Sequence, residues 1–166
     1  MIFLGLGANL PSGRYGEPQD TLEAALGKLP EAGIEVAARS RWWRSAPLPA
    51  SDQPWFVNGV AALRTKLAPD DLLLKLQQIE TAVGRRRSQA NAARVVDLDL
   101  LAYDDFVRRP PSGGGALQLP HPRLAERAFV LLPLAELAPD WRHPLSGRSV
   151  AGMIADLGPQ AIEPLA

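Results

Sequence analysis

The sequence predicts an α+β domain in which the order of elements is strand, helix, strand, strand, helix, strand. Two patterns carry this prediction. Short apolar runs rich in branched side chains recur along the chain, and two amphipathic segments with helical spacing fall between them. This order matches a two-layer sandwich of the β-α-β-β-α-β type. We found no internal repeat and no linker, so we expect one domain over residues 1–166.

The first strand is expected in residues 2–7, an apolar run that contains two glycines. These glycines lack the spacing of a nucleotide-binding glycine loop, so we expect them to allow close packing or a turn. A helix is predicted over residues 20–29, because its leucines and alanines repeat at helical spacing. Asp20 and Glu23 have the spacing of a capping box at its start.

Two extended segments supply the middle strands. Residues 34–43 alternate apolar and polar side chains, and residues 55–65 are mainly apolar. The second segment contains Asn58, whose amide needs partners if it is buried. From spacing alone, a structural role for Asn58 is favoured over contact with the edge of a heterocyclic ligand.

The second helix is predicted over residues 69–84. Pro69 suits the first helical position, and the acidic pair that follows favours the positive end of the helix dipole. The apolar seam of this helix consists of Leu72, Leu76, Ile79 and Val83. Gln77 and Glu80 lie beside the seam, and on spacing alone they are expected on a solvated flank.

Residues 95–103 predict a strand on which two carboxylates share one face. Strand side chains alternate, so Asp97 and Asp99 point the same way and the leucines between and after them point the other way. Carboxylates in an apolar strand are costly unless a cation compensates them. The nearby cations are Arg85, Arg86, Arg87 and Arg94.

Two interpretations of this pattern stay open. A structural Arg–Asp network would explain the residues without catalysis. Alternatively, Mg²⁺ typically combines one or two carboxylates with substrate phosphates, and arginine binds phosphates through two N–H groups. The stretch therefore suggests metal-assisted phosphoryl chemistry.

The remaining chain is less regular. A flexible connector is predicted over residues 106–120, and an apolar helix over residues 129–137 that Pro133 should interrupt. His121 lies between two prolines, where it could donate to a phosphate or cap a helix. Residues 138–166 are rich in turns, with one short helix expected.

The composition excludes several classes of protein. The formal net charge is zero, which argues against a nucleic-acid or membrane partner. The absence of cysteine excludes disulfides, thiolate metal sites and a cysteine nucleophile. No signal peptide and no membrane-spanning apolar run is present, so we expect a cytoplasmic protein.

Five segments resemble one known family, in the same order along the chain. They are Gly7-Ala8-Asn9-Leu10, Ser45-Ala46-Pro47-Leu48 with Gln53-Pro54-Trp55-Phe56-Val57-Asn58, Glu80 through Arg87, Arg94 through Leu101, and Leu119-Pro120-His121-Pro122-Arg123 with Arg127 and Phe129. On these residues the chain resembles the 6-hydroxymethyl-7,8-dihydropterin pyrophosphokinases of folate biosynthesis. The resemblance extends over about residues 2–145.

This resemblance implies a fold and an activity. The fold would be a ferredoxin-like α/β/α sandwich with a mainly antiparallel sheet. The activity would be transfer of a pyrophosphoryl group from ATP to the hydroxymethyl oxygen of the pterin, with release of AMP and participation of two Mg²⁺ ions. We expect these two small molecules as partners, no nucleic acid, no membrane, and a monomer.

The resemblance also implies roles for individual residues. The metal ligands would be Asp97 and Asp99, and the catalytic set would be Arg87, Arg94, Asp97 and Asp99. The nucleotide and phosphate region would consist of Gln77, Glu80, Arg87, Arg94, Leu100, His121 and Arg127. The pterin pocket would consist of Ser45, Pro47, Leu48, Phe56, Asn58 and Phe129. The resemblance thereby assigns Asn58 to the pterin edge, with Phe129 stacking on the bicycle.

The sequence departs from the common family pattern in the loop before the Asp strand. Many members carry Arg-Trp-Gly-Pro-Arg there, and its Arg and Trp close over the substrates. Here residues 88–94 are Ser-Gln-Ala-Asn-Ala-Ala-Arg, and only Arg94 matches. Closure would then rest on residues 85–87 or on Asn91. Phe56 also replaces a common Tyr, and Ser45 a common Thr.

Two alternatives belong to other classes. A non-catalytic RNA-binding module of ferredoxin-like fold could present aromatic side chains of its sheet for base stacking, namely Trp42, Trp43, Trp55 and Phe56. Its usual aromatic motif is missing, and paired aspartates repel phosphates in the absence of metal. A nucleotidyl or glycosyl transferase that uses the same Asp-x-Asp arrangement is the second alternative. No residue stands out as a general base.

Overall fold

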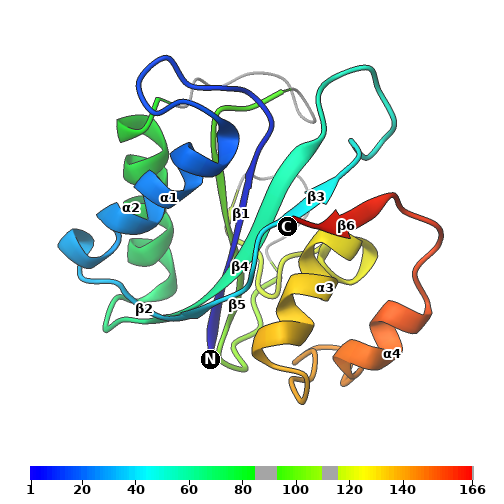
Figure 1. The fold of residues 1–166 in the computed structure, drawn as a ribbon. Coiled ribbons are helices and arrows are strands. Elements are labelled where there is room, and N and C mark those ends of the chain that lie inside the picture. The colour runs from blue at the N-terminus through cyan, green and yellow to red at the C-terminus, as the bar shows by residue number, and fades with distance from the viewer. Residues whose placement is uncertain (85–92, 110–115, 166) are drawn as a thin grey trace.

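The computed structural model describes residues 1–84, 93–109 and 116–165 (Figure 1). Among these residues, six strands form one sheet with the order β5-β1-β4-β3-β6, and β2 also pairs with β4. The strands are β1 (Ile2–Ala8), β2 (Glu35–Arg39), β3 (Trp43–Ser45), β4 (Phe56–Arg64), β5 (Asp97–Tyr103) and β6 (Ile162–Pro164). The helices are α1 (Pro18–Lys28), α2 (Pro69–Ala82), α3 (Ala128–Leu137) and α4 (Val150–Ala155). Short 3₁₀ turns lie at Pro30–Ala32 and Leu124–Glu126.

The sheet has the predicted topology. Strand β1 lies between β4 and β5 and pairs antiparallel with both. Strands β2 and β3 pair with successive parts of β4, so together they occupy one position in the sheet. The resulting order, β5-β1-β4-β2/β3, is that of the ferredoxin-like β-α-β-β-α-β arrangement, and the α+β prediction is confirmed.

Helices cover both faces of the sheet. Helices α1 and α2 lie on one face, and α3 and α4 lie on the other (Figure 1). Each face has its own core: Leu4, Leu22 and Leu76 belong to the first, and Leu131 and Leu134 to the second. The molecule is therefore the three-layered α/β/α sandwich that the resemblance implied, and the element order alone had indicated only two layers.

Two helices differ from their predictions. Helix α1 begins at Pro18, and its capping pair joins Glu17 to Asp20, whose carboxylate accepts the backbone N–H of Glu17 at 3.2 Å. The predicted cap between Asp20 and Glu23 is wrong, because Glu23 accepts instead from Trp42 Nε1 at 3.0 Å. Helix α3 continues through Pro133, which is buried. Burial of this apolar ring offsets the hydrogen bond that proline cannot make.

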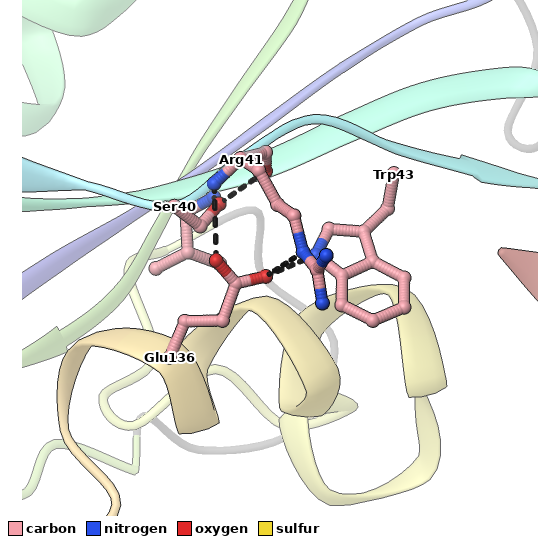
Figure 2. A network of polar contacts seen from close by, with 5 residues as sticks. Ser40, Arg41, Trp43 and Glu136 are labelled. Carbon is pink, nitrogen blue, oxygen red and sulfur yellow. Dashed lines mark hydrogen bonds and ion pairs between the residues drawn. The ribbon is translucent and has the colours of Figure 1, made fainter. Parts of the chain in front are cut away.

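Two of the four aromatic side chains considered for base stacking, Trp42 and Trp43, are buried. Trp42 packs so close to β4 that a Cβ atom at Gly59 would lie 2.7 Å from its ring. Trp43 donates its Nε1–H to Glu136 of α3 at 2.6 Å (Figure 2). With both faces of the sheet covered, the RNA-binding alternative is not supported.

The chain also carries no transmembrane signal in its described part. In residues 1–84, 93–109 and 116–165, no helix combines the length and the apolar character needed to cross a bilayer.

Candidate active site

A pocket opens on the α3 side of the sheet, at the end where β1 finishes and β5 begins. Four strands, β1, β3, β4 and β5, contribute side chains or glycines to it, and the first turn of α3 forms one wall. The lining residues on the strands include Gly5, Gly7, Ser45, Phe56, Asn58, Asp97, Asp99 and Leu101. The α3 end contributes Arg127, Phe129 and Val130.

The glycines of β1 make room for the side chains of neighbouring strands. A Cβ atom at Gly7 would lie 2.9 Å from Oδ1 of Asn58, a distance that real Cβ contacts do not show. A Cβ atom at Gly5 would lie 3.4 Å from the methyl groups of Leu101. The prediction that these glycines permit close packing is confirmed, and the packing they permit is at the pocket.

The six residues that the resemblance assigned to a pterin pocket lie close together. Ser45, Pro47, Leu48, Phe56, Asn58 and Phe129 all line this pocket. Asn58 is buried, and its Nδ2 donates to Oγ of Ser45 at 2.6 Å. Asn58 therefore has a hydrogen-bond partner within the protein, as expected for a buried amide, and it also lines the pocket. Phe129 lies under the guanidinium of Arg127, whose Cζ is 5.3 Å from the ring centroid.

Asp97 and Asp99 lie on the pocket face of β5, as the strand period predicted. Leu98 and Leu100 between and after them belong to the core under α1 and α2. Asp97 Oδ2 pairs with Nη1 of Arg94 at 2.8 Å, and Asp99 Oδ2 lies 4.0 Å from Nη1 of Arg127. Two carboxylates and two guanidinium groups therefore line the pocket together.

These carboxylates fit a magnesium site of the open kind. In the described part of the chain, no three side chains of His, Cys, Asp or Glu gather to form a complete metal cage. Two hard oxygen donors on one face suit Mg²⁺, which keeps the rest of its coordination sphere for water and substrate phosphates. This donor set could hold a metal ion that phosphate oxygens also coordinate.

Several residues that the resemblance assigned to the nucleotide and phosphate region do not line this pocket. Glu80 is buried, and its carboxylate accepts the backbone N–H of Leu98 at 2.7 Å. The predicted solvated flank is thus wrong for Glu80, because α2 packs this residue against β5. Gln77 is half-buried on the same helix. The side chain of Leu100 is in the core and cannot face the pocket.

His121 lies beside β5, where its backbone N–H donates to the carbonyl of Leu101 at 2.8 Å. Its Nδ1 accepts the backbone N–H of Arg123 at 3.1 Å, so the ring closes a turn. Burial, and then the charges of Arg127 and Arg123, lower the pKa of His121 to about 4. The ring is therefore neutral at pH 7, and because Nδ1 is an acceptor, the proton resides on Nε2.

Of the two described arginines that line the pocket, Arg127 is the more enclosed, with 17% of its side chain exposed against 22% for Arg94. Burial lowers the pKa of Arg127, while the negative charge of Asp99 opposes that shift. An arginine retains its charge under such conditions. The guanidinium is thus a fixed positive charge placed beside Asp99 and over Phe129.

Asn9 is a residue of the site that sequence reasoning did not assign. Its side chain is buried, and its Oδ1 accepts the backbone N–H of Arg94 at 2.7 Å. Its Nδ2 donates to Oε1 of Gln53 at 2.8 Å and to the carbonyl of Pro54 at 2.9 Å. One side chain therefore joins the start of the Asp strand to the loop that carries the pterin set. A polar residue directly after a buried strand was the available signal.

Most of the predicted lid lies outside the described residues. Arg87, together with Arg85, Arg86 and Asn91, lies outside the described residues. Arg94 at the far end of this loop is described and faces the pocket.

Known proteins with similar sequences identify the family of this chain. The family profile of the 7,8-dihydro-6-hydroxymethylpterin-pyrophosphokinases (HPPK) matches residues 3–139. A 2-amino-4-hydroxy-6-hydroxymethyldihydropteridine pyrophosphokinase of Pseudomonas aeruginosa is 42% identical over 167 residues, which cover 99% of this chain and 96% of the relative. One of Synechocystis sp. with the same name is 39% identical over 164 residues, covering 98% of this chain and 79% of the relative. A folic acid synthesis protein, fol1, of Pneumocystis carinii is 34% identical over 164 residues, and these are 99% of this chain and only 21% of that protein. The chain belongs to the 7,8-dihydro-6-hydroxymethylpterin-pyrophosphokinase family.

Proposed function

We propose that this protein transfers a pyrophosphoryl group from ATP to the hydroxymethyl oxygen of 6-hydroxymethyl-7,8-dihydropterin and releases AMP, a step of folate biosynthesis. Family membership supports the reaction class and ATP as the co-substrate. We further propose one catalytic domain over residues 1–166, acting as a monomer.

One observation carries the assignment of the site. A pocket lined by an aromatic ring, a buried amide and apolar side chains adjoins two same-face carboxylates and two arginines. A flat heterocycle fits the first half, and phosphates fit the second half. The reacting hydroxymethyl group of a pterin in the first half would point toward the second half.

The pterin half supplies recognition by shape and by hydrogen bonds. The ring of Phe129 offers a face for stacking on the bicycle. The Asn58 amide has two donor hydrogens and an acceptor oxygen, and Ser45 takes one of the donors. The rest of the amide can pair with the amino group and ring nitrogens of the pterin edge. Pro47, Leu48 and Phe56 complete the apolar walls.

The phosphate half stabilises charge as the reaction proceeds. The hydroxymethyl oxygen attacks the β-phosphorus of ATP in line, the bond from that phosphorus to the bridging oxygen of the α-phosphate breaks, and AMP leaves with that oxygen. The proton of the hydroxyl group is released. Arg94 and Arg127 are placed to bind phosphoryl oxygens whose charge grows in the transition state. Neutral His121 can donate its Nε2–H to a phosphate oxygen.

We assign the metal sites to Asp97 and Asp99. Asp97 and Asp99 would hold two Mg²⁺ ions, which would supply Lewis-acid polarisation of the β-phosphoryl group and offset negative charge on the phosphates. The arginines that pair with these carboxylates would then be available to the phosphates. Arg87 is proposed as a further phosphate ligand on the basis of the family motif alone.

The adenosine is proposed to lie along the outer edge of β5. This edge is the side away from β1, where Glu80 meets the N–H of Leu98. Leu100 is two residues farther on, so its backbone N–H and C=O point toward the same edge. Leu100 would therefore contact the nucleotide through its backbone, and Gln77 and Glu80 would act from α2 beside that edge.

An AMP-release assay tests this function. Purified protein is incubated with ATP, Mg²⁺ and the hydroxymethyl pterin, and AMP and the pterin diphosphate are quantified. Other primary alcohols replace the pterin in parallel reactions. We expect AMP only with the pterin. Release of inorganic pyrophosphate would instead indicate nucleotidyl transfer, and release of ADP would indicate transfer of a single phosphoryl group.

Asp97→Ala should lower turnover by at least about a thousandfold, because a metal ligand that acts in the transition state is lost. Asp105→Ala is the matched control, since this exposed carboxylate follows the same strand without facing the pocket. Near-normal AMP production by Asp97→Ala, with an unchanged melting temperature, would overturn the assignment.

A further inference from the structure

The side chain of Gln160 binds the backbone on both sides of Arg127. Its Oε1 accepts the N–H of Ala128 at 3.0 Å, and its Nε2 donates to the carbonyl of Glu126 at 2.8 Å. Gln160 is 32 residues away from Ala128 in the sequence, so this contact joins the end of the chain to the start of α3. No residue after Phe129 had been assigned to the site from sequence.

The contact occurs where the backbone most needs a partner. Arg127 is the extended residue before α3, with φ of −114° and ψ of 111°. The first N–H groups of a helix have no acceptor within the helix, and Ala128 carries the first of them. An amide side chain offers one acceptor and donors in one plane, so it can pair with the two peptide groups that flank an extended residue.

The position of Gln160 is itself fixed by the sheet. The carbonyl of Ala161 accepts the backbone N–H of Ala46 at 3.0 Å, and β6 then pairs with β3 opposite Ser45. The segment from Gln160 to Pro164 therefore connects two walls of the pocket. One is the β3 wall, which carries Ser45, and the other is the start of α3, which carries Arg127.

The direction of the Arg127 side chain depends on this backbone. Its guanidinium reaches Asp99 and covers Phe129, so a rotation of the peptide groups around residue 127 moves a charge at the centre of the site. Oriented groups contribute to catalysis only while their geometry holds, and a shift of about 1 Å can cost about a hundredfold in rate.

We propose that Gln160 is a positioning residue of the active site, which holds the backbone on both sides of Arg127 so that its guanidinium is aligned with the transferred phosphoryl group. This proposal rests on the function proposed above. Gln160 is not among the residues that line the pocket, so it would act through Arg127.

The test compares Gln160→Leu with the parent protein in the AMP-release assay. Leucine has a similar size and removes both hydrogen bonds. We expect kcat to fall by about 10- to 100-fold while KM for the pterin changes by less than about threefold. Glu163→Gln is the matched control from the same segment. It alters an exposed ion pair with Arg44 and should retain the parent rate.

A double-mutant cycle separates positioning from a general loss of structure. If Gln160 acts through Arg127, Gln160→Leu should change the single-turnover rate by less than about twofold in an Arg127→Ala background. An equal loss in both backgrounds would overturn the proposal. Gln160→Glu provides a second variant that keeps the acceptor for Ala128, so the start of α3 stays capped. It should still lose at least about threefold in kcat, because the donor to Glu126 is gone.

Different results would contradict the proposed function and the role of Gln160. A parent protein that releases no AMP from ATP and the pterin contradicts the proposed function. An active parent whose Gln160→Leu or Gln160→Glu variant works at the same rate contradicts the role of Gln160 alone.

Discussion

The amide of Asn58 donates to the hydroxyl of Ser45 over 2.6 Å, and the pair joins neighbouring strands at the pocket. A buried amide that loses its acceptor carries an unpaired donor and can rotate toward another partner. Ser45→Ala should therefore raise KM for the pterin by about 5- to 20-fold, with little change in kcat. Steady-state kinetics with varied pterin and saturating ATP measure this effect.

The conservative variant Ser45→Thr supplies the control, because it keeps the hydroxyl group. We expect it to bind the pterin about as well as the parent protein does. Equal KM values for the Ala and Thr variants would mean that the hydroxyl group has no part in orienting Asn58.

Gly7 determines the position of the same amide from the adjacent strand. A methyl group there would lie 2.9 Å from Oδ1 of Asn58, so Gly7→Ala must displace that side chain. Pterin binding should weaken by about tenfold or more, as measured by titration of intrinsic fluorescence or by calorimetry. Gly13→Ala is the control, since nothing lies within 4 Å of a Cβ atom at that glycine. Unchanged affinity in Gly7→Ala would contradict this packing argument.

The paired aspartates were predictable from sequence because they depend on a local rule. Strand alternation places Asp97 and Asp99 on one face, and the structure confirms it. The six pterin residues lie in three separate parts of the chain, and only the family resemblance grouped them in advance. Local periodicity carries no information on which distant segments meet.

Local sequence patterns also fail where the position of a residue depends on contacts with distant parts of the chain. Helical spacing put Glu80 beside the apolar seam, and only the packing of α2 on β5 shows that it is buried. The pairing of Arg127 with Asp99 crosses 28 positions of sequence, and that of Gln160 with Ala128 crosses 32. Such contacts arise from tertiary structure, which residue spacing alone does not encode.

Glu136 of α3 should be worth more to stability than an ordinary surface acid. Its carboxylate accepts the Nε1–H of Trp43 at 2.6 Å and the backbone N–H of Arg41 at 3.1 Å (Figure 2). Glu136→Leu leaves the buried indole donor without a partner, so the free energy of unfolding should fall by about 2–3 kcal/mol. Urea unfolding followed by tryptophan fluorescence measures the change.

Two further variants test whether that loss of stability comes from the hydrogen bonds of Glu136. Glu136→Gln keeps an oxygen acceptor and should lose about 1 kcal/mol. Glu35→Leu removes an exposed acid that pairs with Arg64 at 3.5 Å, and should change stability by less than about 0.5 kcal/mol. If Glu136→Leu were no more destabilising than Glu35→Leu, the hydrogen bonds of Glu136 would contribute no more to stability than an exposed ion pair does.

His121 should make the fold lose stability as the pH falls. Its folded pKa is about 4, below the ordinary value of 6.5, because burial and two arginines oppose the charged ring. Below pH 6.5 the unfolded chain binds a proton at this residue, and the folded protein does not until about pH 4. The stabilisation that His121 contributes is therefore fully present above pH 6.5 and is lost as the pH falls from 6.5 to 4. The loss in unfolding free energy is at most about 3 kcal/mol.

The variant His121→Asn isolates this contribution. An asparagine oxygen can accept the N–H of Arg123 two residues on, as Nδ1 does now, but it does not titrate. The carboxylates and His143 are common to both proteins, so they cancel in the comparison. Between pH 7 and pH 4 the parent protein should lose up to about 3 kcal/mol more unfolding free energy than the variant does. Parallel curves of stability against pH would show that His121 takes up its proton equally in the folded and unfolded states.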